Sequence, residues 1–415
     1  AAIADRLETT VVVISSKSGS TLETASQRKS YEEAFHGIGI DPAERIVVVT
    51  DPGSPLDVSA RAAGYRVFNA DPNVGGRYSA LTAFGLVPSG LAGVDIRALL
   101  AEASAVTGQL MVDQVENPGL ILGAAIAGTS PLKDKIGIVA DGTYIVGFGD
   151  WVEQLIAEST GKSGKGLLPV VLDLHSPELS ENLDDVQIVR LVESAHATKE
   201  VRDGEIEISG TLGAQMLVWE YAVAVAGRLL GIDPFDQPDV ESAKIATRAL
   251  LDSRPDPVAP AFTVDGIEVR GSTELLAGAD SVSAAINALV SHIGPDGYLA
   301  VQAYVDRHAN PELSKLRDRL AEKTGRPVTF GWGPRFLHST GQYHKGGPAT
   351  GVFLQITATA PADLEIPDSP FSYGYLIQAQ AAGDASVLAD HGRPVLTLTL
   401  TDPAQNLATL FGAIA

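Results

Sequence analysis

A run of small hydroxyl residues near the start of the chain is the first stretch that could do chemistry. Ser15-Ser16-Lys17-Ser18-Gly19-Ser20-Thr21 directly follows the apolar run Thr9 to Ile14 and precedes a polar stretch compatible with a helix. In such a turn, backbone N–H groups can approach an anion closely, and the following helix N-terminus adds its dipole. The loop therefore predicts an anion site. Its side-chain donors would be the hydroxyls of Ser16, Ser18, Ser20 and Thr21, aided by the Lys17 backbone N–H.

The same loop also has a purely structural interpretation. Ser20 and Glu23 have the spacing of a capping box, which would only begin the next helix. The glycine pattern of a dinucleotide fingerprint or a Walker A loop is absent from the loop, so neither nucleotide motif is predicted. Spacing alone does not decide between anion binding and capping.

A carboxylate candidate for proton transfer lies further along, at Glu158. Gln154 and Glu158 are four residues apart and share one face of a predicted helix. The neighbouring face is apolar and predicted to pack inward, through Phe148, Val152, Leu155 and Ser159. A carboxylate at the border of such a face is partly removed from water. The alternative is an ordinary solvated helix glutamate.

Three further positions could supply positive charge or a proton. Arg77 follows Gly75 and Gly76, which allow the backbone to approach a ligand closely. Lys244 follows a predicted helix start at Pro238. In isolation, a loop-anchoring role for Arg77 and a solvated role for Lys244 are both open. The segment Leu337 to Pro348 is rich in small and polar residues, and a histidine within it could exchange protons near neutral pH or serve a structural role.

Composition limits the classes of function. The chain has 415 residues, 45% of them hydrophobic and 20% charged, and a formal net charge of −21. These values predict a folded protein of two or three domains, and the acidic balance disfavours nucleic acid or an anionic membrane as partner. The absence of cysteine excludes disulfides and cysteine-based metal sites. We expect no metal and no cofactor, and a cytoplasmic location because no long apolar run or signal-peptide pattern occurs.

Strand-like and helix-like runs alternate and predict parallel sheets covered by helices. The predicted strands are Thr9 to Ile14, Arg45 to Thr50, Tyr65 to Phe68, Lys135 to Ala140, Val170 to Leu174, Gln187 to Val192, Tyr298 to Val305, Pro327 to Gly331 and Gly351 to Thr357. The main predicted helices are Thr21 to His36, Ser59 to Ala63, Asp95 to Gly108, Gly119 to Gly128, Leu212 to Leu230 and Pro311 to Thr324, the last capped by Asn310. Arg254 to Pro260 is proline-rich and predicts a linker.

Four ordered blocks of sequence resemble the glucose-6-phosphate isomerase family of SIS-type sugar isomerases. They are the S-K-S-x-S-T-x-E-T loop at Ser16 to Thr24, V-G-G-R-Y-S at Val74 to Ser79, Q-x-x-x-E-S-x-G-K at Gln154 to Lys162, and G-I-D-P-F-D-Q-P-D-V-E-S-A-K at Gly231 to Lys244. A looser fifth, Arg335 to Gly347, is similar to the family's histidine segment. Jointly, the four ordered blocks are highly specific.

The resemblance implies an aldose–ketose isomerase that interconverts glucose 6-phosphate and fructose 6-phosphate through a cis-enediol(ate), without a metal, in glycolysis and gluconeogenesis. It makes Glu158 the base, Arg77 the cation that stabilises the enediolate, and Lys244 with His344 the ring-opening pair, His338 being the alternate histidine. Substrate binding would fall to Ser16, Lys17, Ser18, Ser20, Thr21, Gly76 and Gln154. The alternatives are a non-catalytic sugar-phosphate-binding regulatory module and an isomerase that also accepts mannose 6-phosphate.

The resemblance also implies a fold and a domain order. We expect doubly wound, flavodoxin-like three-layer α/β domains: a first SIS-like domain over residues 1–110, a second over 111–258, and a C-terminal α/β region with the histidine segment over 259–415. The family's G-I-G-G-S loop is missing, so we expect that an N-terminal portion is absent, and that a transaldolase domain could be fused upstream.

The order of the blocks departs from the family. The family places its histidine segment before the lysine helix, whereas here the His344 block follows Lys244 by about 100 residues. A partial duplication or an insertion would explain this order. In the family the histidine comes from the neighbouring subunit, which makes a homodimer an expected partner. A rearranged C-terminal region could instead supply it within one chain.

Overall fold

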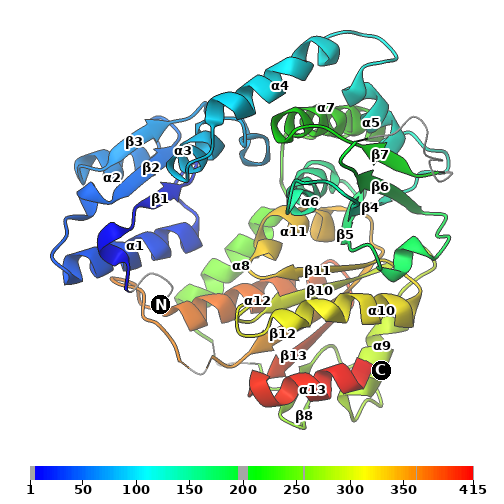
Figure 1. The fold of residues 1–415 in the computed structure, drawn as a ribbon. Coiled ribbons are helices and arrows are strands. Elements are labelled where there is room, and N and C mark those ends of the chain that lie inside the picture. Colours follow the sequence, from blue (N-terminus) through cyan, green and yellow to red (C-terminus); the bar gives the residue numbers. More distant parts are fainter. Residues whose placement is uncertain (1–4, 195–203, 256–257, 361, 415) are drawn as a thin grey trace. The chain divides into compact units, whose positions relative to one another are not determined.

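The computed structural model describes residues 5–194, 204–255, 258–360 and 362–414. The chain forms two compact units, one built from residues 1–108, 211–217 and 363–373, the other from 109–210, 218–362 and 374–415. Each unit contains parallel β-strands covered by helices, as the alternating pattern predicts (Figure 1). The division into residues 1–110, 111–258 and 259–415 remains a prediction. None of the described helices has the length and apolar character that crossing a membrane requires.

The first unit contains a three-stranded parallel sheet in the order β1-β2-β3. Its strands are β1 (Val12–Ser15), β2 (Ile46–Thr50) and β3 (Arg66–Asn69), and its helices are α1 (Leu22–Gly37), α2 (Pro55–Ala62), α3 (Ala83–Leu91) and most of α4 (Ile96–Leu110). Its core joins apolar side chains of the strands, such as Ile14 and Val48, to Phe35 of α1 and Leu56 of α2. The predicted first strand begins later than expected, because residues Leu7–Thr9 form a short 3-10 turn.

The second unit contains two sheets with the same strand order. One is parallel and runs β5-β4-β6-β7; the other runs β11-β10-β12-β13 and adds the antiparallel strands β9 and β8. The first sheet comprises β4 (Lys135–Ala140), β5 (Leu168–Leu172), β6 (Val186–Leu191) and β7 (Ile206–Ile208). The second comprises β8 (Phe262–Val264), β9 (Ile267–Arg270), β10 (Tyr298–Tyr304), β11 (Val328–Trp332), β12 (Gly351–Ala358) and β13 (Val395–Leu400). Both parallel sets have the 2-1-3-4 order of flavodoxin-like folds.

Helices cover both sheets of the second unit. They are α5 (Pro118–Ala127), α6 (Phe148–Thr160), α7 (Leu212–Leu230, from residue 218 on), α8 (Val240–Ser253), α9 (Val282–Val290), α10 (Leu316–Thr324), α11 (Ser339–Gly346), α12 (Tyr373–Asp390, from residue 374 on) and α13 (Pro403–Ile414). Alternate residues of β10 face opposite sides: Leu299 and Val301 join the core under α9, α10 and α13, whereas Tyr298 and Ala300 join a core shared with the other sheet. This strand is buried on both faces, as a three-layer fold requires.

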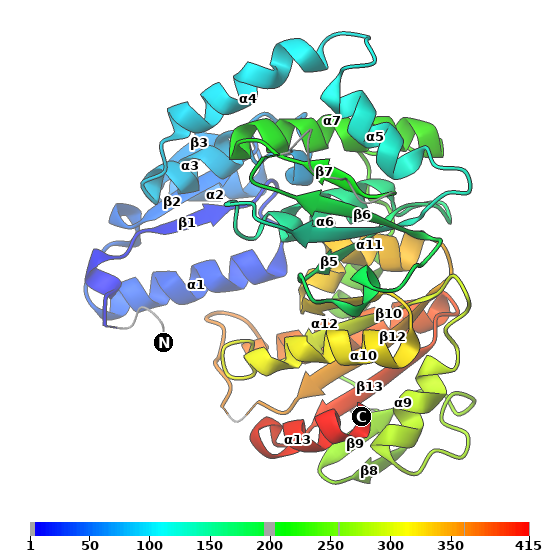
Figure 2. The same ribbon diagram turned by 45° about the vertical axis from the view of Figure 1, so that its right-hand side comes forward.

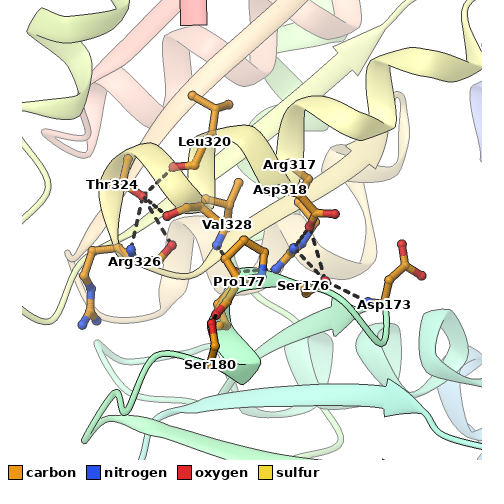
Figure 3. A network of polar contacts seen from close by, with 12 residues as sticks. Asp173, Ser176, Pro177, Ser180, Arg317, Asp318, Leu320, Thr324, Arg326 and Val328 are labelled. Carbon is orange, nitrogen blue, oxygen red and sulfur yellow. Dashed lines mark hydrogen bonds and ion pairs between the residues drawn. The ribbon is translucent and has the colours of Figure 1, made fainter. Parts of the chain in front are cut away.

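Ion pairs also link segments that flank the two sheets, and Figure 3 shows the group around Arg317 and Ser176. Arg317 of α10 is paired with the buried Glu178, which lies in the 3-10 turn after β5, and it donates to Ser176 at 3.1 Å. Arg326, before β11, is paired with Asp185, whose carboxylate also lies 2.9 Å from the fully buried Lys135. The C-terminal region is therefore held to the sheet β5-β4-β6-β7 by charge as well as by apolar packing.

Most predicted elements form, with shifted ends. α2 begins at Pro55 because Ser54 caps it by accepting from the Asp57 backbone N–H, four residues before the predicted start. Asn310 does not cap through its side chain, because its amide donates to the Asp306 carbonyl, although Pro311 begins the turn as predicted. Part of the predicted linker, residues 256–257, lies outside the described residues.

Candidate functional site

The hydroxyl-rich loop lies between β1 and α1 in the first unit, at the carboxyl end of a parallel strand. Gly19 has φ +77°, and a Cβ on it would lie 2.5 Å from Leu56 Cβ, so the turn requires glycine there. The Gly19 backbone N–H donates to Ser16 Oγ at 3.1 Å, and the Ser18 and Ser20 hydroxyls are 2.7 Å apart. Ser18 and Ser20 are exposed and Ser16 is half-buried. This loop can present hydroxyls to an anion.

The capping alternative does not form as predicted. Helix α1 begins at Leu22 with Thr21, not Ser20, as its N-cap, and no side-chain hydrogen bond from Thr21 caps it. The side chain of Lys17 instead contacts two other segments of the first unit. Its ammonium group lies 2.9 Å from Asp51 Oδ1, 2.9 Å from the Val74 carbonyl and 5.4 Å from the Phe84 ring centroid. Lys17 thus connects the loop to the end of β2 and to the segment that leads into Gly75-Gly76-Arg77.

Arg77 lies in that same unit, in a 3-10 turn of residues Gly76–Tyr78, and is buried. Its guanidinium carbon is 5.3 Å from the Tyr78 ring centroid. Neither Gly75 nor Gly76 has a positive φ, and a Cβ at Gly76 would meet nothing within 4 Å. The packing within the chain therefore does not require glycine at position 76. The space that a Cβ there would occupy, next to Arg77 in the sequence, is open.

The base candidate lies in the second unit, on α6. The predicted inward face forms: Phe148, Val152, Leu155 and Ser159 are all buried. Gln154 and Glu158 are half-buried on the border of that face, and Gln154 Nε2 donates to Glu158 Oε2 at 3.2 Å. The amide orients a carboxylate that stays in contact with solvent. Spacing alone was sufficient to predict this pair.

No helix is among the elements predicted for the histidine segment, yet its residues Ser339–Gly346 fold as helix α11, which packs beside α6 (Figures 1 and 2). His344 is buried between the rings of Tyr298, Phe336 and Phe353, with ring centroids 5.1 to 6.1 Å away. Burial, assisted by the charges of Lys345 and Arg393, lowers the pKa of His344 to about 3. This imidazole is neutral near pH 7.

His338 lies at the other end of α11 and is half-buried. It follows β11 and the turn Arg335–Leu337, at the carboxyl end of the second sheet of this unit. Phe336 and Leu337 of that turn pack with Ala243, next to Lys244. The hydrogen bond from Lys244, with charge from Lys244, Arg248 and His338, lowers the pKa of Glu241. His338 and Lys244 therefore lie in the same neighbourhood of the fold.

Lys244 lies on the first turn and a half of α8, which begins at Val240 with Asp239 as its N-cap, so Pro238 precedes the helix rather than opening it. Lys244 Nζ is 2.6 Å from Glu241 Oε1, and both side chains are accessible to solvent. The loop before α8 is fixed by Lys162, whose ammonium donates to the Asp233 carbonyl, the Asp236 carbonyl and Asp236 Oδ1, each at 2.6 Å. The last lysine of the third block thus holds the fourth block, a role that sequence reasoning missed.

The predicted site residues thus fall into two sets. One compact unit holds Ser16, Lys17, Ser18, Ser20, Thr21, Gly76 and Arg77; the other holds Gln154, Glu158, Lys244, His338 and His344. Within the parts of the chain that the structure describes, no three histidine, aspartate or glutamate side chains gather in the manner of metal ligands.

Comparison with known proteins agrees with the blocks. No family model matches the chain. The chain is 30% identical over 294 residues to the glucose-6-phosphate isomerase of Streptococcus pyogenes serotype M18 (strain MGAS8232), covering 58% of this chain and 66% of that protein. It is 31% identical over 296 residues to the glucose-6-phosphate isomerase of Clostridium tetani (strain Massachusetts / E88), covering 57% and 65%. The chain is homologous to glucose-6-phosphate isomerases.

The homology covers part of both proteins: this chain spans just under two thirds of the length of the curated glucose-6-phosphate isomerases that it matches. Among solved structures, a hypothetical protein from Thermus thermophilus aligns with a TM-score of 0.51 at 23% identity, covering 60% of this chain and 74% of that one. At this identity the structural likeness concerns the fold alone. The α/β fold with parallel sheets, expected from a resemblance to these isomerases, is confirmed.

Proposed function

We propose that this chain interconverts glucose 6-phosphate and fructose 6-phosphate, in glycolysis and gluconeogenesis, by moving a proton between C2 and C1 of the open sugar. The observation that carries the proposal is the Gln154–Glu158 pair, an amide-oriented carboxylate at the solvent border of the buried face of α6. A carboxylate so placed can remove a proton next to a carbonyl and return it to the neighbouring carbon. The names of the homologues supply the substrate pair.

In this proposal the two sets of residues have separate tasks. The hydroxyl loop of the first unit holds the phosphate, through the hydroxyls and backbone around Ser18 and Ser20. Glu158 takes the C2 proton; the C–H electron pair forms the C1–C2 double bond, and the aldehyde oxygen becomes an enediolate oxygen. Arg77 stabilises that negative charge, which is the function a metal would otherwise have. A proton then passes from the C2 hydroxyl to the C1 oxygen. Return of the carbon-bound proton to C1, with formation of the carbonyl double bond at C2, gives the ketose.

For ring opening, the described geometry supports His338 over His344. A proton donor and acceptor needs contact with substrate and a pKa near neutrality. His344 is enclosed by aromatic rings, and its pKa is lowered to about 3, so it would not donate a proton near pH 7. His338 is half-buried and lies in the neighbourhood of Lys244. We therefore assign ring opening to Lys244 together with His338, the alternate histidine of the resemblance, rather than with His344.

The test compares Glu158→Gln, His338→Gln and His344→Phe with the parent chain. Isomerisation is followed with fructose 6-phosphate, and binding by calorimetry. We expect Glu158→Gln to bind sugar phosphate without measurable turnover and without deuterium exchange at C1. His338→Gln should slow turnover strongly, whereas folded His344→Phe should retain most of it.

Each other outcome identifies a different error. Turnover that survives Glu158→Gln would overturn the assignment of the base. A parent chain that binds fructose 6-phosphate but never isomerises it would favour the regulatory module. Equal turnover with mannose 6-phosphate would instead favour the broader isomerase.

A further inference from the structure

Gln342, in the middle of α11, makes hydrogen bonds to two other helical elements. Its side chain is fully buried. Nε2 donates to the Gly161 carbonyl at 2.8 Å, at the C-terminal end of α6, and to Asp239 Oδ2 at 2.6 Å, at the N-cap of α8. Oε1 accepts from the Asp239 backbone N–H at 2.9 Å. One amide thus makes hydrogen bonds with residues at the ends of two helices.

The helices that Gln342 joins carry the residues of the proposed chemistry. Glu158 lies one turn before Gly161 on α6, and Lys244 lies just over one turn after Asp239 on α8. His338 precedes α11 itself. Gln342 lies 103 residues from Asp239 and 181 residues from Gly161 in the sequence, so nothing local in the sequence sets the mutual distances of the three segments.

Close backbone contact surrounds the amide. A Cβ on Gly161 would lie 2.3 Å from Tyr343 Cα, and one on Gly346 would lie 2.2 Å from Asp239 Oδ2. Glycine at both positions allows α11 to approach the end of α6 and the start of α8 to within hydrogen-bonding distance. The three hydrogen bonds of the buried Gln342 amide therefore form together only when α11, the end of α6 and the start of α8 have this arrangement.

We propose that Gln342 is a positioning residue that sets the distance and orientation between the Glu158 helix and the Lys244 helix. The expected effect on kcat rests on the proposed function. The expected effect on the distance between α6 and α8 does not. Gln342 itself need not touch the sugar. A displacement of about 1 Å between reacting groups can reduce a rate by roughly 100-fold, so loss of the amide should act mainly on kcat.

The matched control is Gln355, a second buried glutamine. Its Nε2 donates to the Ala381 carbonyl at 2.9 Å, and its Oε1 accepts from Thr397. Those partners lie on α12 and β13, not on α6 or α8. Gln355→Leu therefore removes two buried hydrogen bonds where Gln342→Leu removes three, and neither of the two is made to α6 or α8.

The activity test uses Gln342→Leu, Gln342→Glu and Asp239→Asn/Gln342→Glu beside Gln355→Leu. We expect kcat to fall roughly 10- to 100-fold in Gln342→Leu, with a much smaller change in KM, and less than about threefold in Gln355→Leu at equal folded fraction. In Gln342→Glu two carboxylates face each other, so the loss should deepen as pH rises from about 5.5 to 8.5. Asp239→Asn/Gln342→Glu removes that repulsion and should flatten the pH dependence.

A second measurement is independent of turnover. The chain has no cysteine, so single cysteines at the exposed positions Asp150 on α6 and Ile245 on α8 can carry spin labels. We expect Gln342→Leu to broaden the distance distribution between the labels and Gln355→Leu to leave it unchanged. Unchanged distances together with unchanged kcat in folded Gln342→Leu would overturn the inference. Broadened distances in a chain whose parent has no isomerase activity would leave the positioning role intact and refute the proposed function.

Discussion

The guanidinium of Arg335 lies 2.7 Å from the carboxylate of the buried Glu153, and it also donates to the Asp150 carbonyl at 2.7 Å. Arg335 belongs to the turn before His338, and Glu153 lies on α6 just before Gln154. This contact joins the histidine segment to the first half of α6, as Gln342 joins it to the end of that helix. Glu158 lies between the two connections.

Glu153→Gln should change how stability depends on pH. Burial, opposed by Arg335, raises the pKa of Glu153 to about 7 from an ordinary 4.5. The folded state then holds the proton more tightly than the unfolded state, so stability falls as pH rises from about 4.5 to about 7. Urea unfolding at pH 5 and pH 8 should show a smaller decrease in Glu153→Gln, by up to about 3 kcal/mol. The exposed Glu322→Gln should behave like the parent, and an equal decrease in all three proteins would contradict the prediction.

His344→Phe should improve resistance to acid. Burial lowers the pKa of His344 to about 3, so the unfolded state takes up a proton before the folded state does. Stability is therefore complete above about pH 6.5 and decreases toward pH 3. The free energy of unfolding measured at pH 7 and pH 4.5 should differ less in His344→Phe than in the parent, by about 2 kcal/mol or more. If the two proteins lose stability in parallel, the imidazole is not held neutral by its surroundings.

Lys345 and Asp384 form a fully buried ion pair with a separation of 2.5 Å, between α11 and α12. Lys345→Met leaves the carboxylate unpaired and should cost about 3–5 kcal/mol at pH 8. Because burial raises the pKa of Asp384, protonation should recover part of this loss at lower pH. The double variant Lys345→Met/Asp384→Leu should be closer to the parent than Lys345→Met at pH 8. A double variant that is less stable than Lys345→Met would show that the unpaired carboxylate is not the source of the loss.

Lys162→Met should release the loop that precedes the lysine helix. The substitution removes the ammonium, so three acceptors, two of them backbone carbonyls, lose their donor, at a cost of about 2–4 kcal/mol. Limited proteolysis between Asp233 and Asp236 should accelerate. Asp236→Asn retains both backbone contacts and should be milder on both measures. Equal effects of the two substitutions would mean that the Asp236 carboxylate, not the backbone, anchors the loop.

Gly19→Ala should disturb the hydroxyl loop through packing as well as through backbone strain. Gly39 is the natural control, since its φ of +75° matches the +77° of Gly19 while a Cβ there would meet nothing within 4 Å. We expect Gly39→Ala to cost about 1 kcal/mol, and Gly19→Ala to cost more and to weaken sugar-phosphate binding. Equal stability and unchanged binding in both would show that Leu56 moves aside freely.

The sequence predicted well what depends on local spacing. The inward face of α6 and the Gln154–Glu158 pair follow from helical periodicity, and β4 and α7 match the predicted ranges residue for residue. It predicted poorly what depends on contacts distant in sequence. Helix α11 has glycines and polar side chains that favour a loop, but its environment buries every residue of it and pairs Lys345 with Asp384. Tertiary burial outweighed the local propensity.

The surroundings of the two histidines illustrate the same limit, while the catalytic role of either one remains a prediction. Motif spacing favoured His344, yet a motif carries no information on which ring faces solvent. The aromatic neighbours of His344 lie on β10, β12 and the turn before α11. No pattern within the histidine segment predicts these contacts. The sequence likewise did not indicate the hydrogen-bond partners of Gln342, although it is the one amide side chain in the segment Leu337 to Pro348.

The core shared by the two sheets of the second unit has a consequence for how this protein can be dissected. Tyr298, Ala300 and Phe353 of the C-terminal region complete the apolar layer around Val170, Leu172 and Ile188. A polypeptide ending after α8 would leave that layer facing water. It would also lack the arginines that pair with the Glu178 and Asp185 carboxylates. The last 150 or so residues therefore cover one face of the preceding sheet, and we expect that the preceding sheet does not fold stably without them.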